Sequence, residues 1–290
     1  MARKHTDKKR KQQKQKGYKP TIRRIDGNRW AKLKVLLPRE KPLGTRGRPV
    51  VPDRTVIDGI LYRLRTGGQW KMIPAEYGSG SPCHRRFQEW VEAGIFEQLW
   101  RVRLLYYDRQ RGIGWNWQVL DRVIVPAPRG GEKTGKNPTD RATLGRKRPL
   151  LTDRRGVPLA VVLSGANEHD KHYAEQTVRA TIVRRSRRNR WGHLIVRHFG
   201  ADKGYDFEDV RRVLIRLRYQ VPIGHRRHRG ESEPPLPHGR KHPARRWVVE
   251  RTNSGHNRFR ALKIRWEKKP ENYLALIHFA CALIVFQFLG

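Results

Sequence analysis

The sequence contains little cysteine and no uninterrupted long apolar run, and each scarcity argues against a class of protein. Two cysteines in 290 residues cannot form a disulfide framework, and without CxxC pairs no zinc ribbon is expected. A reducing compartment is therefore expected. The longest apolar run, Leu274 to Leu289, is broken by His278 and Gln287 and is shorter than the roughly 20 residues of a membrane span. It predicts a buried helix. The charged amino-terminal stretch has no apolar core after it, so no secretory signal is expected.

Acidic residues are also scarce: 26 Asp and Glu stand against 65 Lys and Arg, which gives a net charge of +39. A chain that repels itself this strongly favours a polyanionic partner, and nucleic acid is the obvious one. The basic charge is densest at the start. Residues 1–27 are predicted to be a disordered basic tail, which acts as a nucleic-acid arm or is an inert extension.

Residues 28–110 predict a small helical domain that binds DNA. Apolar residues recur at helical spacing from residue 30 until Pro38, and again between Pro52-Asp53 and Gly67-Gly68. A third helix is predicted from an N-cap at Ser81 to Gly94, and a fourth has an apolar stripe from Ile95 through Val102 to Leu105.

Arg85 and Arg86 fall near the start of the third helix, where the recognition helix of a helix-turn-helix protein contacts bases. An ordinary helical bundle with a solvated basic face is the alternative interpretation of the same residues.

Residues 111–290 predict an α/β domain. Strands are expected at 119–125, 149–153, 158–163, 194–199 and 219–223, with a basic loop at 129–148. Helices are expected at 173–188, from a cap at Asp206 through Leu217, at 244–264 and at 271–288. Three strands followed by alternating helices and strands indicate a mixed sheet with helices packed on it.

Three acidic residues do not fit the basic surroundings. Asp121 lies inside an apolar strand, where Asp is depleted, and Asp202 follows the end of a buried strand, where α/β sheets place their sites. Glu250 shares a polar helix face with Arg246 and Asn253, away from the apolar stripe.

Carboxylates converging from two strands and a helix would suit magnesium, and two such ions can drive phosphodiester displacement. From spacing alone, a salt bridge with a basic residue is the favoured interpretation of each carboxylate, and Asp140, Asp153 and Asp170 are further candidates for the cluster.

Eight short motifs are distributed over both halves of the chain. They are GRP at 47–49, LRTGGQW at 64–70, FQEW at 87–90, GKNPTDR at 135–141, KRPLLTD at 147–153, GANEHD at 165–170, ADKGY at 201–205 and RWVVERT at 246–252. Together these motifs closely resemble the DDE transposases of the bacterial IS5 group of insertion sequences. The resemblance extends over about residues 28–288.

The resemblance implies an RNase H-like catalytic domain at 111–290, in which Asp121, Asp202 and Glu250 bind two divalent ions. Magnesium is the expected ion, and manganese can substitute. A metal-activated water would cut the strand at the terminal inverted repeat, and the released 3′-hydroxyl would attack target DNA. The implied partners are double-stranded DNA and at least one further copy of the chain on that DNA, in the bacterial cytoplasm at the nucleoid.

Several basic side chains are expected to contact DNA. Arg246 has pairing with Glu250 as its alternative role. Pro243 and Asn257 stand where the family signature has Tyr and Lys. The expected contacts are Arg85, Arg86, Lys133, Lys136, Lys147, Arg246, Arg251 and Arg258.

The histidines between residues 224 and 243 fit no standard zinc spacing and favour a DNA-facing loop; they are His225, His228, His238 and His242. The competing functions are a non-catalytic transposase remnant, a nuclease of the same fold that does not join strands, and a basic RNA-binding protein.

Overall fold

The structure is a computed structural model that describes residues 24–38, 50–184, 186–189, 191–224 and 246–289. The predictions for the basic tail up to residue 23, for Pro243 and for the four histidines of the basic loop lie outside the described residues.

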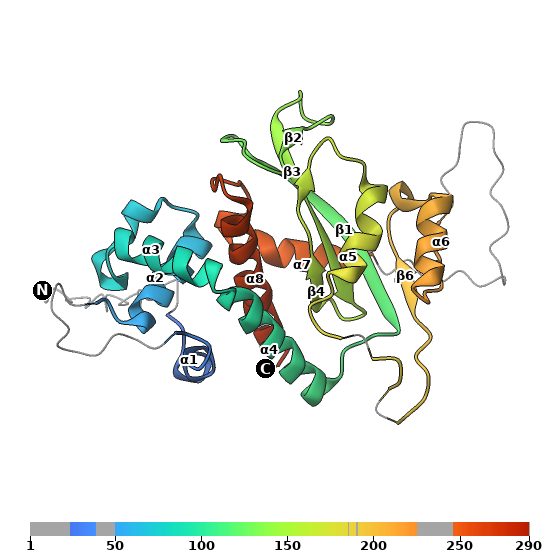
Figure 1. Cartoon of the computed structure of the whole chain (residues 1–290), viewed down its shortest axis with the longest axis horizontal. Coiled ribbons are helices and arrows are strands. Elements are labelled where there is room, and N and C mark those ends of the chain that lie inside the picture. Colours follow the sequence, from blue (N-terminus) through green and yellow to red (C-terminus); the bar gives the residue numbers. More distant parts are fainter. Residues whose placement is uncertain (1–23, 39–49, 185, 190, 225–245, 290) are drawn as a thin grey trace, which may run out of the picture.

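The amino-terminal half is helical, as predicted. It contains α1 (Gly27–Lys34), α2 (Asp53–Thr66), α3 (Gly80–Glu92) and α4 (Ile95–Arg111), with single 3₁₀ turns at Trp70–Met72 and Ala75–Tyr77 (Figure 1). The predicted limits of α2 are confirmed, because Pro52 precedes the helix and Gly67 ends it with a left-handed φ of 71°.

The predicted N-cap of α3 at Ser81 is wrong by two residues. The N-cap is Ser79, whose carbonyl accepts a 3.3 Å hydrogen bond from the amide of Cys83. Pro82 therefore lies in the first turn, where its missing N–H has no intrahelical partner to lose. Gly80 is required here because a Cβ at this position would lie 1.9 Å from the Trp70 carbonyl oxygen.

The buried face of α4 also differs from the predicted stripe. Val102 and Leu105 are 40% and 43% exposed, whereas Trp100, Leu104 and Tyr107 are buried. The reason is α8 (Pro270–Gln287), which packs along α4 and sets which side of that helix is covered. Helix α8 is the buried helix expected near the carboxyl end. Among the described helices, none combines the length and apolar character that crossing a membrane requires.

The sheet is centred on β1 (Trp117–Pro126). Strand β3 (Leu144–Asp153) pairs with β1 antiparallel, and β6 (His198–Gly200) pairs with β1 parallel, so the sheet is mixed as predicted. Strands β2 (Gly135–Lys136), β4 (Pro158–Val161) and β5 (Ser164–Gly165) pair with β3.

The strand limits differ most from the sequence-based limits in three places. The basic loop predicted at 129–148 contains β2 and the first half of β3, because β3 continues its antiparallel pairing as far as Pro126. The strand predicted at 194–199 begins only at His198. The strand predicted at 219–223 is a single bridge between Gln220 and His198.

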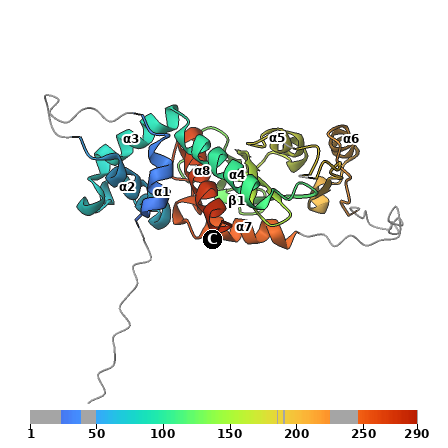
Figure 2. The same ribbon diagram turned by 90° about the horizontal axis from the view of Figure 1, so that it is seen from below.

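Helices cover both faces of the sheet. In Figure 2, α5 (Tyr173–Arg179) lies above the sheet and α7 (Trp247–Asn257) lies below it. The helix predicted at 173–188 therefore ends nine residues early. Helix α6 (Glu208–Arg216) has Phe207 rather than Asp206 as its N-cap, and Asp206 instead forms a 2.6 Å ion pair with Arg211.

These layers confirm the fold class, an RNase H-like mixed sheet flanked by helices and preceded by a helical region. Whether the chain divides at residues 27 and 110 stays a prediction.

Candidate active site

The parallel pairing of β1 with β6 brings the two aspartates to the same level of the sheet. Val119 is the register partner of Gly200, and each predicted aspartate follows its strand position by two residues. Asp121 therefore lies beside the start of the turn that carries Asp202, at the carboxyl end of β6. This is the end of the strands at which α/β folds place ligands.

Helix α7 is anchored to the sheet in a way that brings Glu250 to the same place. The hydroxyl of Thr252 donates a 2.7 Å hydrogen bond to the carbonyl of Gly156, in the turn between β3 and β4. Gly156 has a φ of 91°, and a Cβ there would lie 2.8 Å from the Thr252 hydroxyl oxygen. Val248 and Val249 are buried, so the opposite side of the helix carries Glu250 outward.

Arg246 connects two of the three carboxylates. Its Nη1 lies 3.2 Å from Oδ1 of Asp202, and its Nη2 lies 3.6 Å from Oε1 of Glu250. Two turns beyond Arg246, the Nδ2 of Asn253 donates a 3.1 Å hydrogen bond to Oδ2 of Asp121. Helix α7 and its N-cap Arg246 therefore link all three carboxylates: Asp202 and Glu250 share Arg246, and Asp121 is bonded to Asn253.

The electrostatics of Asp121 reflect this cluster. Burial raises the pKa of the Asp121 carboxyl, and the nearby Glu250 adds to the rise. The Arg122 amide, the Arg246 guanidinium and the Asn253 amide act in the opposite direction, because each stabilises the carboxylate form. A cation near Asp121 would therefore relieve a real electrostatic cost.

The donor set fits hard divalent cations, because it consists of carboxylate oxygens from two strands and a helix. Among the described residues, no three His, Cys, Asp or Glu side chains lie close enough together to hold one metal ion. The Arg246 guanidinium stands between Asp202 and Glu250 and supplies the positive charge there. Metal binding by this set therefore requires Arg246 to turn away.

The three competing aspartates have other roles. Asp153 is fully buried and accepts hydrogen bonds from the amides of Gly114, Arg155 and Val157 at 2.8–2.9 Å, so it holds the hairpin turn. Asp140 is exposed and accepts a hydrogen bond from the Thr143 hydroxyl.

Asp170 forms ion pairs with Arg122 and Lys147. Arg122 directly follows Asp121 on β1, so its side chain lies on the other face of the sheet. Asp170 is therefore held on the face opposite the carboxylate cluster.

The predicted DNA contacts fall into two groups. Those that the structure presents on the surface are Arg85, Lys133, Lys136, Arg251 and Arg258. The remaining three are engaged elsewhere. Arg86 pairs with Asp53 on α2, and Lys147 is buried and pairs with Asp170. Arg246 takes the alternative role of pairing with Glu250, and it also pairs with Asp202. Lys147 in particular has no surface to offer DNA.

The sequence analysis assigns no role to two residues of the site, Asn253 and Tyr205. Asn253 lies three residues after Glu250 on the polar face of the helix, so its position was noted but its bond to Asp121 was not. Tyr205 is buried close to Asp121 and Asp202, and burial raises its pKa. Its hydroxyl has no hydrogen-bond partner among the described residues. No spacing signal distinguishes Tyr205 from a core tyrosine.

Two family models match the chain. The "Transposase DDE domain" matches residues 118–285, and the "Putative transposase of IS4/5 family" matches residues 25–100. The "Putative transposase for insertion sequence element IS402" of Burkholderia cepacia is 38% identical over 166 residues, which are 56% of this chain and 74% of that protein. The "Insertion element IS402 uncharacterized 16.2 kDa protein" of the same organism is 34% identical over 118 residues, 39% of this chain and 80% of that protein.

Among solved structures, the catalytic domain of the Mos1 mariner transposase is 13% identical, with a TM-score of 0.31 over 66% of this chain and 91% of that chain. A similarity at that level supports no conclusion by itself. The family models and the IS402 relative do. The chain belongs to the DDE transposases, in the IS4/5-type group, and is a DNA transposase, an enzyme of the polynucleotidyl transferase class.

Proposed function

We propose that Asp121, Asp202 and Glu250 bind two divalent ions, Mg²⁺ with Mn²⁺ as a substitute, and use them to cut DNA at the terminal inverted repeats. The released 3′-hydroxyl is then joined to target DNA. The observation that supports the proposal is that α7 carries Glu250 and contacts both aspartates, through Arg246 and Asn253, at the carboxyl end of β6. When bound, the ions supply charge stabilisation to the attacking and leaving oxygens of the phosphodiester.

The side chains of α7 have separate tasks in this proposal. Asn253 fixes the orientation of the Asp121 carboxylate through its bond to Oδ2. Arg246 neutralises Asp202 and Glu250 until the ions take over that role. Its guanidinium is then free to form charge-assisted hydrogen bonds with a DNA phosphate.

The DNA partner is supported by the charge of the chain, +39, and by exposed basic side chains on several elements of the carboxyl-terminal half. Arg251 lies on α7 and Arg258 follows it directly. Lys133 precedes β2, and Lys136 is its last residue. The helical region that contains Arg85 is proposed to bind the terminal repeats as a separate domain. Two ends must be held together for transposition, so we propose at least a dimer on DNA.

The test is cleavage of a duplex that contains the cognate terminal repeat, with Mg²⁺, by the wild type, E250Q and E208Q. Glu208 is an exposed residue of α6, so E208Q makes the same chemical change away from the site. The proposal predicts cleavage by the wild type and E208Q and none by E250Q.

Equal cleavage by E250Q would reject the assigned site. No cleavage by any of the three would favour a non-catalytic remnant. Cleaved products without joined products would favour a nuclease.

A further inference from the structure

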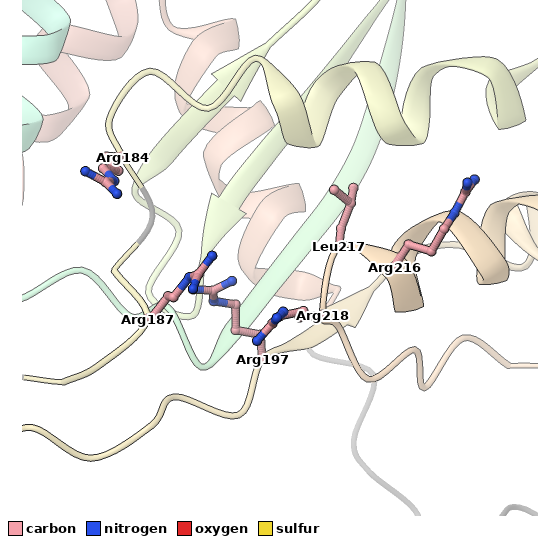
Figure 3. Close-up of a pocket in the computed structure, with 6 residues that line it drawn as sticks. All are labelled: Arg184, Arg187, Arg197, Arg216, Leu217 and Arg218. Carbon is pink, nitrogen blue, oxygen red and sulfur yellow. The ribbon is translucent and has the colours of Figure 1, made fainter.

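An arginine-lined hollow lies at the opposite end of β6 from Asp202. Its volume is about 300 Å³, and five of its six lining residues are arginines, as Figure 3 shows. Among the described residues that line it, none is acidic. The lining residues are Arg184, Arg187, Arg197, Arg216, Leu217 and Arg218.

The frame of this arginine pocket is built by paired backbone segments. The amide of Ile195 donates a 3.0 Å hydrogen bond to the carbonyl of Arg187, and the amide of Gln220 donates a 2.7 Å bond to the carbonyl of Arg197. Arg197 is only 7% exposed, and its Nη2 donates a 2.5 Å bond to the carbonyl of Ser186. Arg187, Arg197 and Arg218 gather at the centre of Figure 3, and the backbone segments that carry them are hydrogen-bonded to one another.

Arg218 occupies this pocket in an unusual backbone conformation. Its φ is 64°, directly after the end of α6, where the left-handed conformation normally selects glycine or asparagine. The amide of Tyr219 bonds to the carbonyl of Leu214, which closes the helix end. An arginine therefore stands at a position whose backbone conformation favours glycine or asparagine.

The helix dipole explains only part of the charge of the pocket. The carboxyl end of α6 attracts cations and so accounts for Arg216 and Arg218. It does not account for Arg184, Arg187 and Arg197, which come from a different segment. Arginine forks match the oxygens of a phosphate group, so a phosphate is the ligand that this arrangement suits.

We propose that the arginine pocket binds a backbone phosphate of the DNA, at a site distinct from the carboxylate cluster. The inference rests on the proposed function, because it assumes a DNA duplex held at Asp202. Arg197 and Asp202 are five residues apart along an extended segment, which corresponds to roughly 16 Å at about 3.3 Å per residue. A duplex rises about 3.4 Å per base pair, so the bound phosphate lies about five base pairs from the cleaved bond.

The test is the salt dependence of duplex binding by wild type, R187Q/R218N and a charge-matched control, R179Q/R212Q. Asparagine is chosen at 218 because it tolerates the left-handed backbone. Arg179 and Arg212 are exposed and already paired with acidic neighbours on their own helices, and neither lines the pocket, so their loss removes the same charge outside it.

Each phosphate contact contributes about −0.9 to the slope of log K against log salt. Loss of the one bound phosphate is expected to make the slope shallower by about 0.9 in R187Q/R218N, with no comparable change in the control. If R187Q/R218N does not fold by circular dichroism, the single variants R187Q and R218N test the same pocket.

The possible outcomes distinguish a failure of the pocket proposal from a failure of the proposed function. Equal slopes for the pocket variant and the control, in a wild-type protein that cleaves DNA, would overturn the pocket and leave the function standing. A slope change with single-stranded RNA but not with duplex DNA would also overturn it. A wild type that neither binds nor cleaves DNA would overturn both.

Discussion

The Nδ2 of Asn253 donates a 3.1 Å hydrogen bond to Oδ2 of Asp121, across 132 residues of sequence. A hydrogen bond to a charged group contributes about 1.5–3 kcal/mol. N253A is therefore expected to lower the free energy of unfolding by about that amount in urea titrations without metal, and to slow DNA cleavage.

The matched control for N253A is N257A, which removes an exposed asparagine from the end of the same helix. If both variants lose equal stability and cleave at equal rates, Asn253 does not support Asp121.

Arg246 is expected to compete with metal ions for Asp202 and Glu250. In R246Q, the two carboxylates face each other without a cation, so the metal-free protein should lose stability. The loss should be below about 1 kcal/mol because both pairs are about half exposed. Added Mg²⁺ should then raise the melting temperature of R246Q more than that of the wild type, because no ion pair has to be broken first. An identical metal-induced shift in both proteins would rule out the competition.

Asp153 should matter for folding rather than for chemistry. D153A leaves three backbone amides without an acceptor, two of them buried, and a loss of about 3–5 kcal/mol of unfolding free energy is expected. D140A, in an exposed turn, should change stability by less than about 0.5 kcal/mol. Chemical denaturation of the two variants makes the comparison. A mild effect of D153A would contradict the role of Asp153 in the hairpin turn.

The α4–α8 interface should be sensitive to acid through His278. Burial lowers the pKa of His278 to about 4, against 6.5 for an ordinary histidine. Between these values the unfolded chain binds a proton that the folded chain does not, so stability is full above pH 6.5 and falls as the pH drops toward 4. The shift corresponds to up to about 3 kcal/mol.

In H278F this contribution to the pH dependence is absent. The difference in unfolding free energy between pH 7 and pH 4.5 should therefore be smaller in H278F than in the wild type. Urea titrations at the two pH values measure it, and an unchanged difference would show that His278 is not the titrating group.

The sequence predicts elements better than it predicts the contacts between them. The limits of α2 follow from Pro52 and Gly67, whose backbone preferences act locally. The buried side of α4 does not, because α8, more than 150 residues later, decides which face is covered. The apolar residues around Gln220 predict a full strand at 219–223, but only Gln220 pairs with β6, through a single bridge to His198.

The same distinction holds in the site. Asp121, Asp202 and Glu250 are visible in the sequence because carboxylates on core elements of a basic protein are conspicuous. The ion pair of Arg246 with Asp202 and the bond of Asn253 to Asp121 depend on how α7 lies on β1, which no local pattern encodes. The positive charge of Lys147 predicts a DNA contact, but the charge alone does not reveal that β3 buries this side chain beside Asp170.

The most direct test of the carboxylate cluster is a Mn²⁺ titration followed by electron paramagnetic resonance, with the wild type, D121N, D202N and E250Q in the presence of DNA. The account predicts up to two bound ions per chain in the wild type and a loss of tight binding in all three variants. Ions bound equally well by the wild type and the three variants would contradict it.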